Sequence, residues 1–164
     1  MRSRRGIIAL GAFGGLALAT SRKALAADNC RNTEAVNAAV LDKYVAAMNA
    51  RDTSTFPDIF TESYIQHSGR SPSGLAAMID LFKNIFAALP DRSMQVEDRI
   101  IAGDKVVARC TYTQTHSNVF RGIPPTGKRF SYRTIDIWRV ESGKFAEHWD
   151  LTDAEEVLRT LRAS

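Results

Sequence analysis

The 164-residue chain is long enough for about one domain with a substantial core. Its formal net charge of +4 and its pI near 9.3 would by themselves suggest a protein that binds nucleic acid. However, residues 1–26 hold five basic and no acidic residues, so the rest of the chain has a formal charge of −1. We therefore exclude nucleic acid as a partner.

Residues 1–26 have the pattern of a cleavable export signal. A basic region over residues 1–5 precedes an uncharged apolar run over residues 6–19, and Ala24-Leu25-Ala26 is a small-residue cleavage site. The paired arginines of the basic region resemble the twin-arginine type of signal. We predict a protein that is periplasmic or secreted, has no membrane partner after cleavage, and consists of a single domain over residues 27–164.

Three segments of the mature chain have the three- and four-residue spacing of apolar side chains that is typical of amphipathic helices. They run from Asn32 to Arg51, from Ser73 to Leu89 and from Asp153 to Leu161. A further helix of one or two turns is predicted around Thr53 to Phe60, where Pro57 limits its length.

Alternation of apolar and polar residues predicts five strands, at residues 62–68, 94–101, 105–120, 129–140 and 144–151. The last two flank a turn and form a hairpin. Helices followed by a long meander indicate an α+β domain. We expect a cone-shaped barrel: a strongly curved antiparallel or mixed sheet whose concave face is covered by the N-terminal helices, with a ligand cavity between them.

The hairpin carries the residues in which we expect chemistry. Because side chains alternate along a strand, one side of its first strand presents Tyr132, Thr134, Asp136 and Trp138, and one side of its second strand presents His148 and Asp150. If these sides coincide, two carboxylates and an imidazole meet beside a tryptophan. An acid is costly to bury without a partner or a task, so this arrangement indicates a functional site.

Several short motifs occur along the chain: Ala88-Leu-Pro-Asp91, Gly103-Asp-Lys-Val-Val107, Gly122-Ile-Pro-Pro-Thr-Gly-Lys128, Ile135-Asp-Ile-Trp-Arg139, Gly143-Lys144, Glu147-His-Trp-Asp150 and Asp153. Together they resemble the motifs of the SnoaL-like polyketide cyclases, also called ester cyclases, of the nuclear transport factor 2-like cone-fold superfamily. The resemblance covers nearly all of the mature chain.

The resemblance implies an intramolecular aldol closure without metal or cofactor, in which an aspartate removes a proton next to a carbonyl of a hydrophobic, polyketide-like ester. The acidic base of the family falls on Asp150. Anthracycline cyclases carry a histidine that assists this base, and by spacing Asp136 takes its place here. Two structural roles compete with this interpretation: Asp150 could cap the C-terminal helix, and Asp136 could pair with a neighbouring arginine.

One face of the predicted strand 105–120 presents Tyr112, Gln114 and His116. We interpret Gln114 and His116 as candidate donors to the oxygen of an enolate, count His116 with the catalytic residues, and expect Tyr112 to form a wall of the pocket. A competing interpretation of His116 is a half-exposed position near the end of the strand.

The remaining candidate binding residues lie on or near the hairpin. Tyr132 and Trp138 are expected inside the cavity, and Trp149, by alternation, outside it. His148 is placed to hydrogen-bond Asp150. His67 precedes a loop rich in Gly, Ser and Pro, and is either structural or at the mouth of the cavity. No pair of histidines has metal-ligand spacing, so we predict neither a metal nor another cofactor.

Two further functions remain open. An epoxide hydrolase of the same fold would need two aspartates and an arginine; Asp136 and Asp150 with Arg109 or Arg133 supply the residue types, although alternation turns both arginines away. The second is a non-catalytic binding protein for a small hydrophobic molecule.

Two features of association also remain open. The apolar face with Thr111, Thr113, Ile135 and Ile137 favours a homodimer. An oxidising compartment permits a Cys30–Cys110 disulfide, although Cys110 has the apolar neighbours of a core thiol.

Overall fold

The structure, a computed structural model, describes residues 15–163, except for the side chains of residues 15–28 and 31–32. The chain forms two compact units, Met1–Asn32 and Thr33–Ser164. The predicted export signal over residues 1–26 lies outside the described residues, apart from the helical backbone that begins at Gly15. Among the described residues, no helix combines the length and the apolar character that a membrane span requires.

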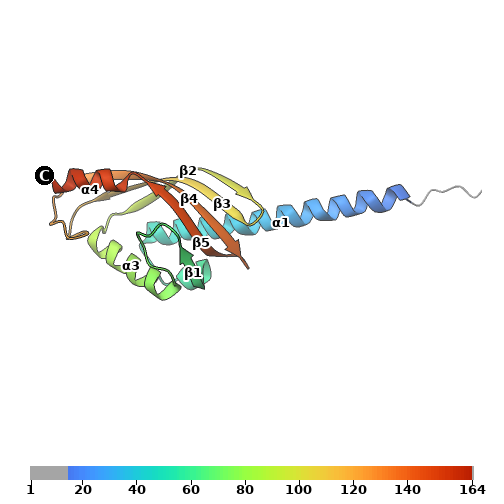
Figure 1. The fold of residues 1–164 in the computed structure, drawn as a ribbon, viewed down its shortest axis with the longest axis horizontal. Coiled ribbons are helices and arrows are strands. Elements are labelled where there is room, and N and C mark those ends of the chain that lie inside the picture. Colours follow the sequence, from blue (N-terminus) through green and yellow to red (C-terminus); the bar gives the residue numbers. More distant parts are fainter. Residues whose placement is uncertain (1–14, 164) are drawn as a thin grey trace, which may run out of the picture. The chain divides into compact units, whose positions relative to one another are not determined.

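All of the predicted helices and strands are present (Figure 1). In chain order they are α1 (Gly15–Ala50), α2 (Phe56–Ile59), β1 (Phe60–Gln66), α3 (Leu75–Ala88), β2 (Ser93–Ala102), β3 (Lys105–Thr115), β4 (Arg129–Glu141), β5 (Lys144–Thr152) and α4 (Ala154–Arg162). Helix α1 begins before the predicted Asn32, because the preceding residues are rich in Ala and Leu, which are strong helix formers.

Strand β3 ends at Thr115, whereas alternation extended it to about Phe120. The chain turns away because the backbone N–H of His116 donates to the carbonyl of Lys128, and that of Gly127 donates to the carbonyl of His116. These two bonds close the loop over residues 116–128. Its Ile123 packs with Leu158 and Leu161 of α4 in a small second core.

The five strands form one mixed sheet in the order β1-β5-β4-β3-β2. Strand β1 runs parallel to β5, and the other neighbours are antiparallel. Helix α3 and the C-terminal part of α1 lie on the same side of the sheet (Figure 1). The predicted α+β class and the mixed sheet with helices over one face are confirmed; the sheet is open, with β1 and β2 as its edges, and is not closed into a barrel.

The β4–β5 hairpin is joined by Ser142 and Gly143, whose φ angles are 51° and 73°. Two positive φ angles match the twist of two-residue hairpin turns and favour glycine at the second position. Early in β5, a register shift leaves Ala146 without a partner: Val140 pairs with Phe145, but Arg139 pairs with Glu147. This β-bulge resets the register of all later pairs.

The register after the bulge decides which residues face each other. Asp136 lies opposite Asp150, and Trp138 lies opposite His148. Without the extra residue, Asp136 would lie opposite Trp149. The two functional sides of the hairpin therefore coincide because of the bulge.

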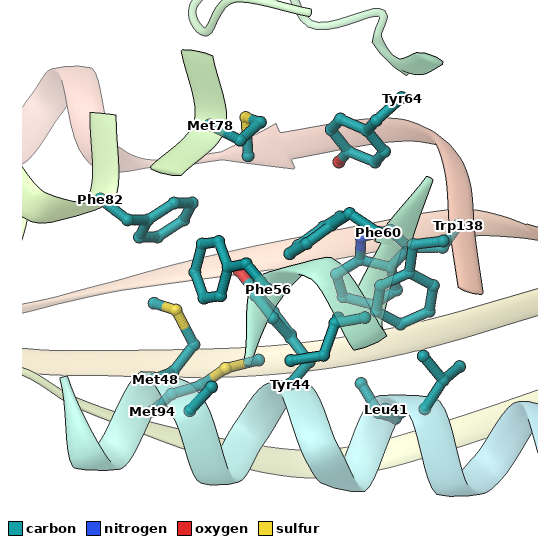
Figure 2. Packing of buried hydrophobic residues seen from close by; sticks show 14 of the residues in the cluster. Leu41, Tyr44, Met48, Phe56, Phe60, Tyr64, Met78, Phe82, Met94 and Trp138 are labelled. Atoms are coloured by element: carbon teal, nitrogen blue, oxygen red, sulfur yellow. The ribbon is translucent and has the colours of Figure 1, made fainter. Parts of the chain in front are cut away.

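The main core lies between the helices and this side of the sheet. Figure 2 shows Leu41, Tyr44 and Met48 directed from α1 into the cluster of buried side chains, with Met48 beside Met94 and away from Trp138. Trp138 stacks on Phe145 with 4.8 Å between ring centroids. Burial of each large aromatic side chain contributes roughly 2–3 kcal/mol, so this cluster fixes helix and sheet against each other around the site.

Candidate functional site

A cavity of about 120 Å³ lies between the inner side of β3, β4 and β5 and helix α3. The hairpin contributes Tyr132, Thr134, Asp136, Trp138, His148 and Asp150 to its lining. Met78, Phe82 and Ile85 of α3 cover it with apolar groups. The lining is about equally apolar and polar and includes several charged side chains, and a concave site of this kind is a candidate small-molecule site.

Asp136 is buried, with 3% of its surface exposed, and both of its carboxylate oxygens are hydrogen-bonded. The Thr134 hydroxyl donates to Oδ2, and His148 Nε2 lies 3.0 Å from Oδ1. The amide nitrogen of Gln66 lies 2.8 Å from His148 Nδ1, and the amide oxygen of Gln66 accepts from the backbone N–H of Ser68.

These contacts fix the tautomer of His148. The Ser68 N–H identifies the oxygen of the Gln66 amide, so the amide nitrogen donates to Nδ1 of His148. Nδ1 then accepts, and the proton lies on Nε2, which donates to Asp136. Both ring nitrogens are thus engaged, and the ring stacks on Trp138 with 5.0 Å between centroids. Asp136 and His148 form a fixed pair in the cavity wall.

Asp150 has a different environment. The Arg70 guanidinium donates to its Oδ2, and the side chain of Asp150 is 12% exposed. Its Oδ1 is buried and has no hydrogen-bond partner. A carboxylate held through one oxygen keeps the other oxygen free to accept a proton from a ligand that reaches it.

Tyr64 of β1 also lines the cavity and is 1% exposed. Burial, and after it the neighbouring Tyr44, Asp136 and Asp150, raises the pKa of Tyr64 well above its ordinary value. Its hydroxyl therefore keeps its proton and is available as a neutral donor.

The sequence matches the family model described as SnoaL-like polyketide cyclase over residues 38–161. The chain belongs to this family. A relative, nogalonic acid methyl ester cyclase from Streptomyces nogalater, is 26% identical over 112 residues, which cover 67% of this chain and 81% of the relative.

Solved structures share the fold of this SnoaL-like chain. TsrD from Streptomyces laurentii has a TM-score of 0.72 and 30% identity, and the match covers 79% of this chain and 97% of TsrD. AclR from Streptomyces galilaeus has a TM-score of 0.70 and 30% identity, and the match covers 79% of this chain and 98% of AclR. Membership in this family supports a cyclase- or isomerase-type function.

The structure brings most of the predicted SnoaL-like site residues together. Those that line the cavity are Tyr112, Tyr132, Asp136, Trp138, His148 and Asp150. Trp149 lies on the opposite face of the sheet, stacked on His67.

The arginine partner considered for Asp136 is not found among the described residues; His148 takes that place. His148 contacts Asp136 rather than the predicted Asp150, because it lies diagonally across the strands from Asp136.

Three predicted residues do not line this cavity. His116 is buried, but its Nδ1 lies 3.1 Å from the hydroxyl of Thr126, so it anchors the loop over residues 116–128. Gln114 lies behind the cavity wall and accepts from Arg92. His67 bonds to Glu147 on the outer face. We therefore leave all three out of the catalytic machinery.

The geometry also decides between the structural roles considered for the acids, arginines and cysteines. Asp150 does not cap α4; the residue at that N-cap is Asp153, and Thr152 accepts from the backbone N–H of Ala154. Arg109 and Arg133 pair with Asp98 and Asp153, away from the cavity. Cys110 is a buried free thiol within the main core.

Several cavity residues were missed in the sequence, among them four that contribute to the polar part of the site. Arg70 and Arg92 were not considered, because each lies in a connection between elements where no periodicity assigns a face. Gln66 and Tyr64 alternate on β1, which was recognised as a strand, and that alternation was the available signal. Among the described residues, no group of three or more His, Cys, Asp or Glu is placed to hold a metal ion.

Proposed function

We propose that this protein is a cyclase of the SnoaL-like family in which Asp150 removes a proton next to a carbonyl group of a small hydrophobic, polyketide-like ester. The observation that carries the proposal is Oδ1 of Asp150. Among the described residues, it is the carboxylate oxygen that is buried without a hydrogen-bond partner, and it belongs to a residue that lines the cavity.

In the proposed reaction, Oδ1 of Asp150 takes the proton from the carbon, and the electron pair of the broken C–H bond forms an enolate. The neutral hydroxyl of Tyr64 donates to the enolate oxygen. The enolate carbon then attacks a second carbonyl of the same molecule, which forms the C–C bond. The resulting alkoxide recovers the proton from Asp150.

Asp136 and His148 have a positioning role in this proposal. Both oxygens of Asp136 are already bonded, so it is less available as a base than Asp150. The pair holds the imidazole flat against Trp138, which gives the substrate a rigid apolar and polar wall. Apolar groups from α3 exclude water from the reacting carbon.

The test measures proton abstraction directly and does not require the natural substrate. A bicyclic ketone such as 2-tetralone is incubated with the protein in D₂O, and exchange of the hydrogens next to the carbonyl is followed by NMR. We expect the wild-type protein to accelerate exchange and Asp150→Asn to reduce this acceleration by roughly 10²–10⁴-fold, the usual contribution of a positioned base.

Asp98→Asn is the matched control, since Asp98 is exposed and pairs with Arg109 away from the cavity. It should exchange the ketone at the wild-type rate. Acceleration that is equal in the wild-type protein and in Asp150→Asn would rule out Asp150 as the base.

One observation favours a second function, epoxide hydrolysis. Asp136, Asp150 and Arg70 line one cavity and supply two carboxylates and a guanidinium, the groups expected for activating water against an epoxide. In that case H₂¹⁸O should label a diol product, and both Asp136→Asn and Asp150→Asn should abolish its formation. Tight ligand binding without turnover in either assay would instead indicate a binding protein.

A further inference from the structure

Arg92 is a buried arginine in the wall of the same cavity. It lies between α3 and β2, and 4% of its surface is exposed. Its Nη1 donates to Oε1 of Gln114 over 2.8 Å, and its Nη2 donates to the hydroxyl of Tyr132. The guanidinium lies 4.4 Å from the ring centroid of Tyr112, and its Nε is buried without a hydrogen-bond partner.

None of these partners carries a negative charge. Gln114 is a neutral amide, and burial raises the pKa of Tyr112 well above its ordinary value, so its phenol stays protonated. Other described arginines, all more exposed than Arg92, do pair with carboxylates; these are Arg70, Arg99, Arg109, Arg121, Arg129, Arg133 and Arg139.

A buried cation without a counter-charge is unfavourable, and a guanidinium is the side chain best suited to a planar anion such as a carboxylate. The distance between Arg92 and the cavity carboxylates follows from positions along β4. Tyr132, which bonds Arg92, precedes Asp136 by four residues on the same face of β4, a separation of about 13 Å along the strand. The side chains span part of this distance.

We propose that Arg92 is the anion-binding residue of this cavity, and that its ligands are flat hydrophobic molecules with a carboxylate, or an equivalent acidic enol oxygen, about one or two ring widths from the carbon presented to Asp150. The identification of these ligands as substrates rests on the proposed function. Anion binding by Arg92 does not.

The test compares two probes of the same shape, 2-naphthoate and the neutral 2-naphthamide, by isothermal titration calorimetry at pH 7.5. The wild-type protein should bind naphthoate at least about tenfold more tightly, a difference of about 1.4 kcal/mol. Arg92→Gln should bind both probes equally. Arg70→Gln, which removes the cavity arginine that pairs with Asp150, should keep the preference.

Gln114→Glu provides a second variant in case Arg92→Gln does not fold. It places a carboxylate against Nη1 of Arg92 without removing the guanidinium, and should also abolish the preference for naphthoate. Equal binding of the two probes by the wild-type protein, or a preference that persists in Gln114→Glu, would overturn the proposal. A preference that disappears in Arg70→Gln would assign the anion to Arg70 and would also overturn it.

The two proposals can fail separately. Asp150→Asn should bind naphthoate at least as tightly as the wild-type protein, since Asp150 is not part of the anion site. Naphthoate preference without any ketone exchange would therefore retain Arg92 as an anion site and reject the proposed cyclase. Exchange of the ketone hydrogens without a preference for naphthoate would retain the proposed cyclase and reject Arg92 as an anion site.

Discussion

Cys110 illustrates how its surroundings determine the chemistry of a single residue. It is fully buried on the inner side of β3, where it pairs in register with Thr134. Burial, and after it the charge of Asp136, raises the pKa of the Cys110 thiol to about 12. The thiolate, which is the reactive form, is therefore scarce in the folded protein at neutral pH.

We predict that Cys110 reacts with iodoacetamide at pH 8 only after unfolding. In a Cys30→Ser variant, mass spectrometry should find no adduct on the native protein and one adduct in urea. The raised pKa also predicts that the folded protein loses stability at high pH. The stability contributed by the protonated Cys110 thiol is fully present below the pKa of the unfolded thiol, near 9.0, and is lost as the pH rises toward 12. Rapid labelling of the native protein would contradict the assignment.

At the scale of the elements, the connection between α3 and β2 is tied to the end of β3 by Asp91. Its carboxylate accepts from the backbone N–H and the hydroxyl of Thr115, each over 2.7 Å. These bonds lower the pKa of Asp91, with the backbone bond as the largest cause. The contact lies next to Arg92, so it also supports the cavity wall.

We predict that Asp91→Ala reduces the free energy of unfolding by about 1 kcal/mol at pH 7, a modest value because the carboxylate is 41% exposed. Because the folded pKa is lowered, this stabilisation is present above the unfolded value of 3.8 and is lost as pH falls through the folded pKa. Urea unfolding should therefore show a smaller difference in the free energy of unfolding between the wild-type protein and Asp91→Ala at pH 3 than at pH 7. Asp80→Ala, on the exposed face of α3, should show little effect at either pH.

At the scale of the whole molecule, the outer face of the sheet carries exposed apolar side chains in register. Ile135 lies opposite Leu151 and Ile137 opposite Trp149, and Leu151 is 73% exposed. An apolar patch of this kind is typical of an interface. We therefore keep the homodimer as a prediction.

Leu151→Glu should convert the dimer to a monomer, because it places a charge on the most exposed apolar side chain of this face. Size-exclusion chromatography with light scattering measures the mass directly. Val119→Glu is the control: Val119 is 63% exposed but lies in the loop after β3, and its substitution should leave the dimer intact. A wild-type protein that is monomeric at micromolar concentration would refute the prediction.

Export remains a second prediction for the whole chain. With Arg4 and Arg5 both replaced by Lys, the protein should stay in the cytoplasm as the full-length precursor, since the paired arginines are the address of this route. Cell fractionation and N-terminal sequencing test this, and the wild-type protein should begin near Ala27. Periplasmic protein from the double variant would assign the signal to the general secretion route.

The sequence by itself determined the elements, the α+β class and the family, because periodicity, turn residues and motifs depend on neighbours along the chain. It also placed Asp136 and Trp138 on one side of β4, and His148 and Asp150 on one side of β5. Local alternation was sufficient for this, since each strand is regular over those residues.

The tertiary structure alone decided how these sides meet. The bulge at Ala146 brings Asp136 opposite Asp150, and one residue fewer would have placed Trp149 there. The tertiary structure also brings Arg70 into contact with Asp150, which follows 80 residues later in the chain. It buries Arg92 among neutral groups. Contacts between distant segments depend on how the elements pack, and that packing has no local signature in the sequence.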